Sequence, residues 1–328
     1  MLSATETRLP CRIARFEKLN DAIVEIEIQA ENKTPLPEFT AGSHIDLHLP
    51  GGLVRQYSLC SAPSDTHAYR IAVLREEAGR GGSEAVHTQL KPGDAVTISA
   101  PRNLFPCHDS AKAVFIAGGI GITPLLCMVR ERAASGHAFE LHYSVSQATR
   151  LVYRETLQAL CKTAEQRVRF YADDAAPTER LDLDLAIPAF DHDTHLYVCG
   201  PAGLIDATLA KAASIGWPET HLHSERFQAP QPPATEIAPG EFLLSLQGEF
   251  ENLHVPAGKS ILQVLKEAGA DVPASCEQGI CGTCCLRVVE GEPDHRDYCL
   301  NDKARQEQGL FAPCCSRAHG AHLTLARV

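Results

Sequence analysis

Basic residues are in short supply in this sequence. Its 328 residues include 30 lysines and arginines against 41 aspartates and glutamates, which gives a formal net charge of −11. A protein that binds nucleic acid needs a basic surface to neutralise phosphates. The composition therefore excludes nucleic acid from the expected partners.

Long apolar runs are also missing. No stretch approaches the roughly 20 apolar residues that a helix needs to span a bilayer. The first residues, MLSATETRLPCRIARFEK, lack the apolar centre of a signal peptide. We expect a protein that has no membrane partner and works in the cytoplasm.

The chain is long enough for two or three domains. In residues 1–107, short segments with alternating apolar and polar residues are separated by glycine- and proline-rich turns. This pattern is typical of an antiparallel β-barrel. Its strands are expected at Ile23–Ile28, Ile45–Leu49, Arg70–Leu74 and Ala95–Ser99.

The pattern changes in residues 108–227. Ala113–Ala117 is continuously apolar, as in a strand that is covered on both faces. Strand-like and helical segments then alternate as far as Phe227, which predicts a parallel α/β sheet. The expected helices are 124–134, 154–162 and 201–215, and the expected strands are 139–145, 168–172 and 195–199.

Residues 228–240 are rich in proline and poor in apolar residues, so they predict a semi-stiff linker. The remaining segment, 241–328, begins with a strand-like run at Glu241–Gln247. Ser260 and Gln263 then form a capping-box pattern, which predicts a helix that ends at Gly269. A third domain is therefore expected after the linker.

The thirteen cysteines are unevenly distributed, and seven of them fall within residues 276–315. Cys276, Cys281 and Cys284 follow the spacing C-x4-C-x2-C, and Cys314 comes after a further 29 residues. This is the plant-type arrangement of four thiolates that hold a [2Fe–2S] cluster. We therefore predict these four cysteines as cluster ligands in a reducing compartment.

Two alternatives compete with the cluster. One is a structural zinc site, although such sites usually pair two short cysteine knuckles. The other is a set of buried cysteines that bind nothing. Gly279 and Gly282 favour the cluster, because glycines let the chain wrap closely around cluster sulfurs and point backbone N–H groups at them.

The neighbouring cysteines leave an ambiguity. Cys285 and Cys315 are also separated by 29 residues. Adjacent residues in extended chain point to opposite sides, so only one of each adjacent pair should face the cluster. We interpret Cys285, Cys299 and Cys315 as small buried apolar residues.

The segment from Pro273 to Cys284 resembles a plant-type ferredoxin loop, and Pro293–Asp297 and Cys314–Ala318 resemble the phthalate dioxygenase reductase family. The likeness covers nearly the whole chain. It implies a multidomain protein with an FMN-binding barrel at 1–107, an NAD-binding domain at 108–227, a linker, and a β-grasp ferredoxin domain at 241–328. FMN is expected instead of FAD, because no additional adenosine-binding segment is evident.

The run Arg55-Gln56-Tyr57-Ser58 resembles the flavin motif of ferredoxin-reductase-like enzymes. In such a site Arg55 pairs with the phosphate, Tyr57 packs along the flavin ring, and Ser58 forms a hydrogen bond near flavin N5. An ordinary strand is the alternative interpretation. Gln56 is included in the expected site.

A second segment suits the flavin phosphate. Arg80, Gly81, Gly82 and Ser83 offer backbone N–H groups and a hydroxyl at the expected start of a helix. The alternative is a flexible hairpin turn. By resemblance, the flavin is also lined by Ala72, Thr123 and Phe227.

Two loops are expected to hold the nicotinamide nucleotide. Gly118, Gly119 and Gly121 follow the first buried strand and open a helix, where glycines let a pyrophosphate approach. A tight strand-to-helix turn would explain them equally. By resemblance, Cys199 lies beside the nicotinamide carbon that releases hydride, and Gly200 and Pro201 shape the adjoining turn. A buried structural cysteine is the alternative for Cys199.

The adenosine half of the nucleotide is expected near Ser144, Ser146 and Asp173. A 2′-phosphate needs a dedicated basic residue, and none follows Ser146 directly, so NADH is expected. Arg150 keeps NADPH open, and a solvated acidic turn would also explain Asp173. By resemblance, the catalytic residues are Cys199, Ser58 and Thr123.

The resemblance implies an NADH-dependent reductase that passes electrons through FMN and the [2Fe–2S] cluster to a partner. That partner is expected to be the terminal component of a Rieske-type oxygenase, an aromatic-ring dioxygenase or an O-demethylase, with the reductase a monomer. One alternative acceptor is a haem monooxygenase or a separate ferredoxin. A ferredoxin-like binding protein with an inactive reductase is the non-enzymatic alternative.

Overall fold

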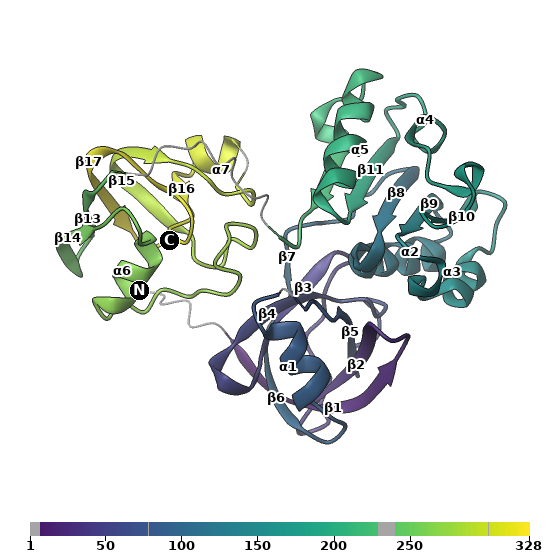
Figure 1. Ribbon diagram of the computed structural model, residues 1–328, viewed down its shortest axis with the longest axis horizontal. Helices are drawn as coiled ribbons and strands as arrows, with labels where there is room; N and C mark the ends of the chain where they lie inside the picture. Colours follow the sequence, from purple (N-terminus) through teal and green to yellow (C-terminus); the bar gives the residue numbers. More distant parts are fainter. Residues whose placement is uncertain (1–6, 78, 229–239, 301) are drawn as a thin grey trace. The chain divides into compact units, whose positions relative to one another are not determined.

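The computed structural model describes residues 7–77, 79–228, 240–300 and 302–328. The chain forms two compact units, Met1–Phe227 and Gln228–Val328, here called the N-terminal and C-terminal units (Figure 1). The predicted linker at 228–240 lies almost entirely outside the described residues. Within the described ranges, no helix is long and apolar enough to cross a membrane.

The first part of the N-terminal unit is a curled antiparallel sheet in the order β4-β3-β6-β1-β2-β5, with β7 beside β3. β4 and β5 form the two ends of this order and approach each other at a bridge between Leu59 and Ile71. The elements are β1 (Arg8–Lys18), β2 (Ile23–Ala30), β3 (Ser43–His48), η1 (Pro50–Gly52), β4 (Val54–Ser58), β5 (Tyr69–Leu74), α1 (Gly82–Gln89), β6 (Ala95–Ser99) and β7 (Arg102–Asn103).

This sheet confirms the predicted barrel class and its four predicted strands. The sequence patterns do not predict β1, because charged residues and Pro10 interrupt its apolar alternation. Only Cys11 and Ile13 of that strand are fully buried. β1 nevertheless pairs with both β2 and β6, so it joins the two halves of the curled sheet.

The second part of the N-terminal unit is a parallel sheet in the order β10-β9-β8-β11-β12. The strand order reverses at β8: β9 and β10 lie on one side of it, and β11 and β12 lie on the other. α/β proteins usually bind nucleotides at such a point. The elements are β8 (Lys112–Gly118), η2 (Gly119–Gly121), α2 (Ile122–Ser135), β9 (Ala138–Val145), η3 (Ala148–Arg150), α3 (Arg154–Leu160), β10 (Gln166–Ala172), η4 (Pro177–Glu179), α4 (Leu183–Ala186), β11 (Thr194–Cys199), α5 (Ala202–Ser214), η5 (Glu219–His221) and β12 (Leu222–Glu225).

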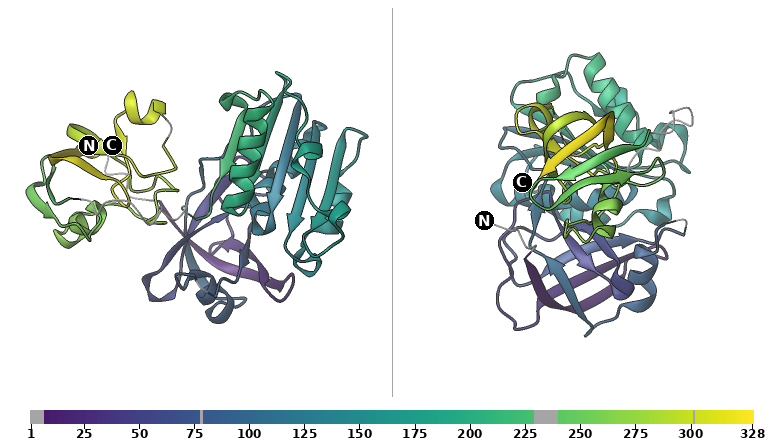
Figure 2. Two further views of the ribbon diagram at one scale, coloured as in Figure 1. Left: turned by 45° about the horizontal axis from the view of Figure 1, so that its top comes forward. Right: turned by 90° about the vertical axis from the view of Figure 1, so that its left-hand side faces the viewer.

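Helices cover both faces of the parallel sheet, as Figure 2 shows. On one face, Val114 and Val198 pack with Ile205 of α5 and Ala186 of α4. On the other face, Phe115 and neighbouring strand residues join a larger core with α2, α3 and the barrel. This larger core explains why the predicted strands here read as continuous apolar runs.

The C-terminal unit is a mixed sheet in the order β14-β13-β17-β15-β16, in which β13 runs parallel to β17 and the other pairs are antiparallel. The predicted capping box at Ser260 and Gln263 is present at the start of α6. The elements are β13 (Phe242–Leu246), β14 (Phe250–Val255), α6 (Ile261–Glu267), β15 (Leu286–Asp294), α7 (Asp302–Gln306), β16 (Leu310–Phe311) and β17 (Arg317–Ala326).

Candidate functional site

Side chains from three strands meet at the carboxyl edge of the parallel sheet. Cys199 ends β11 and stands in register with Glu225, which ends β12. The hydroxyl of Ser58, at the end of β4, donates a hydrogen bond to Glu225 Oε2 over 3.3 Å. The structure therefore brings the predicted Ser58 and Cys199 together and adds Glu225, which the sequence patterns did not predict.

Burial controls the protonation of this group. It raises the pKa of Cys199 well above the ordinary value of a thiol, and the Glu225 carboxyl adds to that shift. Burial also raises the pKa of Glu225 to about 8, while the hydrogen bond from Ser58 acts in the opposite direction. At neutral pH Cys199 is therefore a protonated thiol, and a nucleophilic role is disfavoured because only a thiolate attacks readily.

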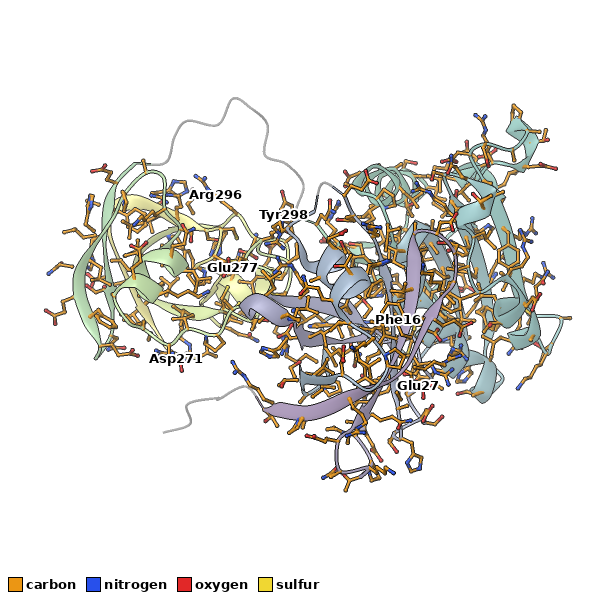
Figure 3. The ribbon with its side chains drawn as sticks, turned by 60° about the horizontal axis from the view of Figure 1, so that its bottom comes forward. Phe16, Glu27, Asp271, Glu277, Arg296 and Tyr298 are labelled. Carbon is orange, nitrogen blue, oxygen red and sulfur yellow. The ribbon has the colours of Figure 1, made fainter. Side chains whose placement is uncertain are left out.

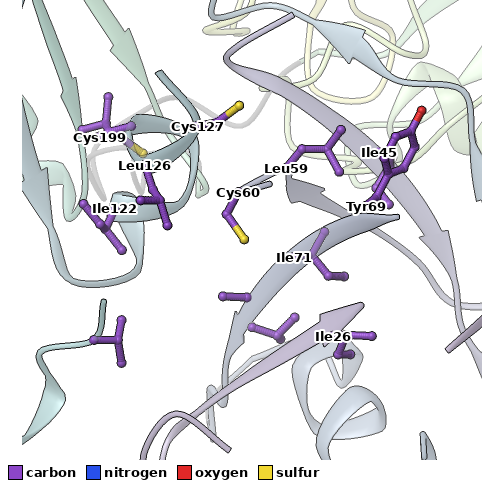
Figure 4. Packing of buried hydrophobic residues seen from close by; sticks show 14 of the residues in the cluster. Ile26, Ile45, Leu59, Cys60, Tyr69, Ile71, Ile122, Leu126, Cys127 and Cys199 are labelled. Carbon is purple, nitrogen blue, oxygen red and sulfur yellow. The ribbon is translucent and has the colours of Figure 1, made fainter. Parts of the chain in front are cut away.

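Cys199 is completely buried, and Figure 4 shows it with Ile122 and Leu126 of α2 in the larger core. Its side chain can be replaced by few others, because close-packed cores leave no room for added atoms. The thiol therefore forms a small, rigid part of the wall at the carboxyl edge.

Two loops approach each other backbone to backbone at this edge. A Cβ atom on Gly121 would lie 2.3 Å from the carbonyl oxygen of Cys199, and one on Gly200 would lie 2.9 Å from Cα of Gly118. A Cβ on Gly118 would lie 2.7 Å from Cδ of Pro201. The protein's own packing thus requires glycine at 118, 121 and 200, as the tight-turn alternative predicted.

Gly119 differs from its neighbours. Its φ is +54°, and a Cβ atom built on it would meet nothing within 4 Å. Gly119 is therefore the glycine of this loop that leaves open space. Thr123, by contrast, is buried, and its hydroxyl donates a hydrogen bond to the carbonyl of Ile120 over 3.0 Å, which closes the turn into α2.

Arg55 lies against the start of α1. Its Nη2 atom donates to the carbonyl of Arg80 over 2.5 Å, and a Cβ on Gly82 would lie 2.4 Å from Arg55 Cγ. Gly81 precedes the helix with φ +76° and no side-chain cap. A guanidinium beside uncapped helical N–H groups is suited to an anion such as a phosphate.

Ser83 is engaged within the same turn, where its Oγ accepts a hydrogen bond from the amide of Glu76 over 3.1 Å. Its predicted hydroxyl contact with a phosphate would therefore compete with this bond. The backbone N–H groups of the helix start do not face that competition, so they are the stronger part of the candidate phosphate site.

The remaining predicted flavin residues lie on β4, on β5 and just beyond β12. Tyr57 is half-buried, and burial raises its pKa, so the phenol stays neutral. Ala72 is buried on β5, and Phe227 is 37% exposed just beyond β12. The side-chain amide nitrogen of Gln56 is buried and has no hydrogen-bond partner among the described residues. A buried donor without a partner is suited to a ligand that accepts a hydrogen bond.

The predicted adenosine residues lie at the same carboxyl edge. Ser144 is near the end of β9, and Ser146 follows that strand and is exposed. The amide of Asp173 donates to the carbonyl of Val145 over 3.0 Å, which ties the ends of β9 and β10 together. Arg150 is exposed in η3, four positions after Ser146 in the sequence.

In the C-terminal unit, the four predicted ligands are buried and grouped in two pairs. The thiols of Cys276 and Cys281 are within hydrogen-bonding reach of each other, and so are those of Cys284 and Cys314. Across the described chain, no three His, Cys, Asp or Glu side chains are placed to hold one metal ion. Two pairs of thiols fit a cluster with two irons better than a single zinc ion.

Backbone amides point at these sulfurs. The amide of Gln278 donates to Sγ of Cys276 over 3.4 Å. The Cys281 thiol, followed by the amides of Gln278 and Ile280, lowers the pKa of Cys276 to about 7. Amides also reach the other pair and Cys281: Gly279 donates to Cys314, and Thr283 donates to Cys281. Such N–H groups are the donors that cluster sulfurs need.

The adjacent cysteines face other neighbours. The thiol of Cys285 contacts Cys299, which lies outside the predicted ligand set. Sγ of Cys315 lies 3.8 Å from the carbonyl oxygen of Ala312, and a Cβ on Gly279 would lie only 2.4 Å from that sulfur. Cys315 also interacts with Cys314 next to it. Cys285 thus has a thiol neighbour outside the predicted ligand set, whereas Cys315 stays within reach of the predicted ligand Cys314.

A second segment braces the cysteine loop. The amides of Tyr298 and Cys299 both donate to the carbonyl of Gly279, over 2.8 and 3.1 Å. Buried Asp297 anchors this segment through Arg305, whose Nη2 donates to the Asp297 carbonyl over 2.8 Å. The side chain of Tyr298, labelled in Figure 3, is 53% exposed. The predicted motif around Arg296 and Asp297 therefore supports the loop from outside the ligand set.

Two relevant residues escaped the sequence patterns. Glu225 and Arg226 follow each other at the end of β12, a strand of only four residues. Nη1 of Arg226 is buried and has no hydrogen-bond partner among the described residues. The sequence signal that could have identified Glu225 and Arg226 is their position just before the predicted Phe227. A short edge strand has too few residues to show a recognisable periodicity.

Family models match two parts of the chain: an oxidoreductase NAD-binding domain at residues 115–210 and a 2Fe-2S iron-sulfur cluster binding domain at residues 244–319. The vanillate O-demethylase oxidoreductase of Pseudomonas sp. (strain HR199 / DSM 7063) is 45% identical over 304 residues, 92% of this chain and 95% of that protein. A solved structure of phthalate dioxygenase reductase matches with a TM-score of 0.72 and 35% identity, over 97% of this chain and 98% of that one.

The chain belongs to the phthalate dioxygenase reductase family. It is an oxidoreductase with an NAD-binding domain and a [2Fe–2S] domain, and it is a reductase component of an oxygenase system. This confirms the predicted family, the three-part fold and the enzymatic class. An active oxidoreductase therefore describes this chain better than an inactive ferredoxin-like binding protein does.

The same module occurs in another setting. An intact type IV self-sufficient cytochrome P450 monooxygenase matches with a TM-score of 0.85 and 35% identity, over 97% of this reductase. The reductase spans about two fifths of that protein, since it covers 41% of its chain. The family thus includes modules within larger monooxygenases.

Proposed function

We propose that this oxygenase reductase takes hydride from NADH onto FMN and passes electrons through its [2Fe–2S] cluster to a Rieske-type terminal oxygenase. The observation that carries the proposal is that one chain combines the Ser58–Cys199–Glu225 junction with four paired thiols in an amide-lined loop. A flavin supplies the change from two-electron to one-electron transfer when it is bound, and a [2Fe–2S] cluster accepts one electron at a time.

We assign the flavin site to β4, β5 and the start of α1, together with Phe227 beyond β12. Arg55 and the amides of Gly81, Gly82 and Ser83 hold the phosphate, with Arg80 beside them. Tyr57 and Phe227 pack against the ring, Ala72 leaves room for it, and Gln56 donates its unpartnered N–H. The uncapped start of α1 and the buried, unpartnered amide of Gln56 support this assignment.

The nicotinamide nucleotide is assigned to the carboxyl edge of the parallel sheet. Gly119 leaves space for its phosphates, while Gly118, Gly121, Gly200 and Pro201 let the two loops meet. The exposed Ser146 and the nearby Ser144 and Asp173 face the adenosine half. NADH is the expected donor, and a comparison of kcat/KM for NADH and NADPH tests this choice.

At the junction, the protein holds a proton and excludes water. The raised pKa of Glu225 keeps its carboxyl protonated at neutral pH. Ser58 orients that carboxyl by its hydrogen bond. Cys199 fills the adjacent space with a neutral thiol that neither repels nor attacks the nicotinamide. We therefore assign Ser58 and Cys199 as catalytic residues that touch the reacting rings, while Thr123 shapes the loop beneath them.

The cluster ligands are assigned as Cys276, Cys281, Cys284 and Cys314. Their arrangement in two pairs and the four amides that point at them support this set. Tyr298 and Glu277, both labelled in Figure 3, are exposed. Glu277 lies in the cysteine loop and Tyr298 in the segment that braces it, so we assign this surface to the approach of the electron acceptor.

The flavin identity is tested by acid release and chromatography of the flavin from purified protein. FMN is expected, and FAD without FMN would contradict the assignment. The same preparation tests the predicted monomer by light scattering. The domain boundaries 1–107, 108–227 and 241–328 are tested by limited proteolysis, which should cut within 228–240.

A haem protein is the second candidate acceptor, because the cytochrome P450 monooxygenase described above contains a matching module. Purified reductase should reduce a Rieske-type oxygenase from the same genome at a rate that supports turnover with NADH. Faster reduction of a haem monooxygenase than of every such oxygenase would favour the second candidate. The cytoplasmic location stays a prediction.

A further inference from the structure

Four histidine rings lie stacked at the amino ends of β11 and β12, at the edge of the sheet opposite Cys199. Nδ1 of His195 on β11 lies 2.8 Å from Nε2 of His223 on β12. The ring of His221 stacks on His195 with centroids 4.5 Å apart, and the ring of His108 lies 4.6 Å from that of His223. No part of the proposed electron path uses these rings.

Metal binding does not account for the stack. Parallel rings do not direct their nitrogens toward one point, and among the described residues no three potential ligands are placed to hold an ion. The 2.8 Å contact instead requires one nitrogen with a proton and one with a lone pair. The pair can share one added proton, but two added protons would leave N–H groups facing each other.

The surroundings also oppose protonation. Burial lowers the pKa of His223 to about 3, and His108, His195 and His221 add to the shift. Burial lowers the pKa of His195, with contributions from His221, His108 and Arg132 of α2. Both imidazoles are therefore neutral in the folded unit.

Arg132 of α2 is a charged group whose field reaches His195, and two further titratable groups near the rings are neutral. Tyr197 lies between the rings and the core, and burial raises its pKa. Cys107, in the loop that carries His108, also has a pKa raised by burial, to about 11. The charged residues of α5 belong to the opposite face, where Asp206 pairs with Arg226 and Lys211 pairs with Asp184.

The stack is mechanically linked to the candidate active site. β12 is a four-residue strand at the edge of the sheet, in register with β11. Alternate residues of a strand share a face, so His223 and Glu225 lie on the same face of β12, and Phe227 follows two residues later. Short edge strands open more readily than central ones. A displacement of His223 therefore also moves Glu225, because both residues belong to the same short strand.

We propose that the His195–His223 pair is a pH-sensitive latch that holds β12 closed while both rings are neutral and releases it in acid. Release would displace Glu225 and Phe227 from the junction. This functional consequence rests on the proposed flavin site, whereas the opening of β12 itself does not.

The direction of the pH effect follows from the lowered pKa values. A released imidazole has its ordinary pKa of 6.5, so the open state binds more protons below that pH than the closed state. The opening constant should rise by up to about tenfold per pH unit for each ring below pH 6.5. Glu225 acts in the opposite direction between pH 8 and 4.5, because its folded pKa is raised, so the histidine effect must be isolated with variants.

Hydrogen–deuterium exchange of the complete, cofactor-loaded protein tests the latch. The measured quantity is the protection of the amides of 222–227 at pH 7.5 and 5.5, corrected for intrinsic exchange. His223→Gln keeps a hydrogen-bonding side chain but cannot titrate, so it lacks the contribution of this ring while keeping that of Glu225. Over this interval the ratio of wild-type to His223→Gln protection should therefore fall about tenfold. His254→Gln, an exposed histidine of the C-terminal unit, should behave as the wild type.

A ratio of wild-type to His223→Gln protection that is the same at both pH values would overturn the proposal. If His223→Gln does not fold, His195→Gln gives the same test from the other ring. NADH–ferricyanide turnover measured in parallel separates the two proposals. Absence of turnover at pH 7.5 would count against the proposed function and leave the exchange result interpretable.

Discussion

The loop after β8 and the cysteine loop both contain closely spaced glycines, but these glycines accommodate different neighbours. In the first loop, Gly118 and Gly121 make room for the backbone at Cys199 and Gly200, and the loop lies between a strand and a helix. In the second, Gly279 makes room for Cys315 and for backbone at Asp297. Within residues 273–285 the structure assigns neither helix nor strand.

This difference teaches where each site gets its shape. The nucleotide loop is fixed by a large apolar core that exists without any ligand. The cysteine loop depends on its amide contacts and on whatever its thiols bind, since metal binding and folding are coupled in such sites. We expect substitutions in the first site to alter rates, and substitutions in the second to remove the site.

The largest effect is expected for Cys314→Ser. It removes one thiol of the Cys284–Cys314 pair, so the cluster should be lost, and reduction of the partner oxygenase should fall by more than the roughly 10–100-fold typical of changes around a metal site. NADH–ferricyanide turnover should largely survive, because the N-terminal unit keeps its core. Electron paramagnetic resonance of the reduced protein measures the cluster.

Cys315→Ser is the matched control for that experiment. It alters the neighbouring thiol that packs against Gly279 and should retain the cluster, at some cost in stability from the buried hydroxyl. A normal signal in Cys314→Ser combined with none in Cys315→Ser would reverse the ligand assignment.

Cys199→Ala should alter a rate and spare the fold. The nicotinamide would lose part of the wall that positions it, so the limiting rate of flavin reduction should fall about 10–100-fold while NADH affinity changes little. Stopped-flow absorbance at saturating NADH measures this rate. Cys127→Ala, a buried thiol of α2 labelled in Figure 4, is the control that should leave the rate nearly unchanged. Equal rates in the two variants would return Cys199 to a structural role.

The protonated form of Glu225 gives a pH prediction. With a pKa of about 8, the carboxyl loses its proton above pH 8, and the limiting rate of flavin reduction should fall by up to about tenfold per pH unit there. Ser58→Ala removes the hydrogen bond that lowers this pKa, so the decline should move to higher pH. Glu225→Gln should abolish it. A decline at the same pH in all three proteins would assign it to another group.

The smallest effect is expected at the phosphate cradle. Arg55→Lys keeps the charge but loses the paired donors of the guanidinium, so the flavin Kd should rise by about tenfold. Gly82→Ala should have a similar or smaller effect, because the new Cβ meets the flexible Arg55 side chain and not backbone. Flavin fluorescence during dilution measures release. The control is Arg75→Lys, because Arg75 forms an exposed salt bridge with Glu84 of α1.

The sequence by itself determined the architecture and the metal chemistry. Alternation, continuous apolar runs and a capping box are local patterns, so they predicted four strands of the barrel, the parallel sheet and α6. The C-x4-C-x2-C spacing is also local, because three ligands sit in one loop. These features depend on neighbours along the chain, which sequence periodicity records.

Only the tertiary structure decided the rest. Glu225 gains its raised pKa and its contact with Ser58 from strands that are 167 residues apart in sequence, and no local pattern marks it. The same holds for the roles of Gly118 and Gly121, which depend on the backbone at the end of β11 and just after it, and for the four stacked histidines, which come from three separate segments. The sequence names the residue types that can do chemistry, but burial and proximity decide which of them share a site, and both are properties of the folded chain.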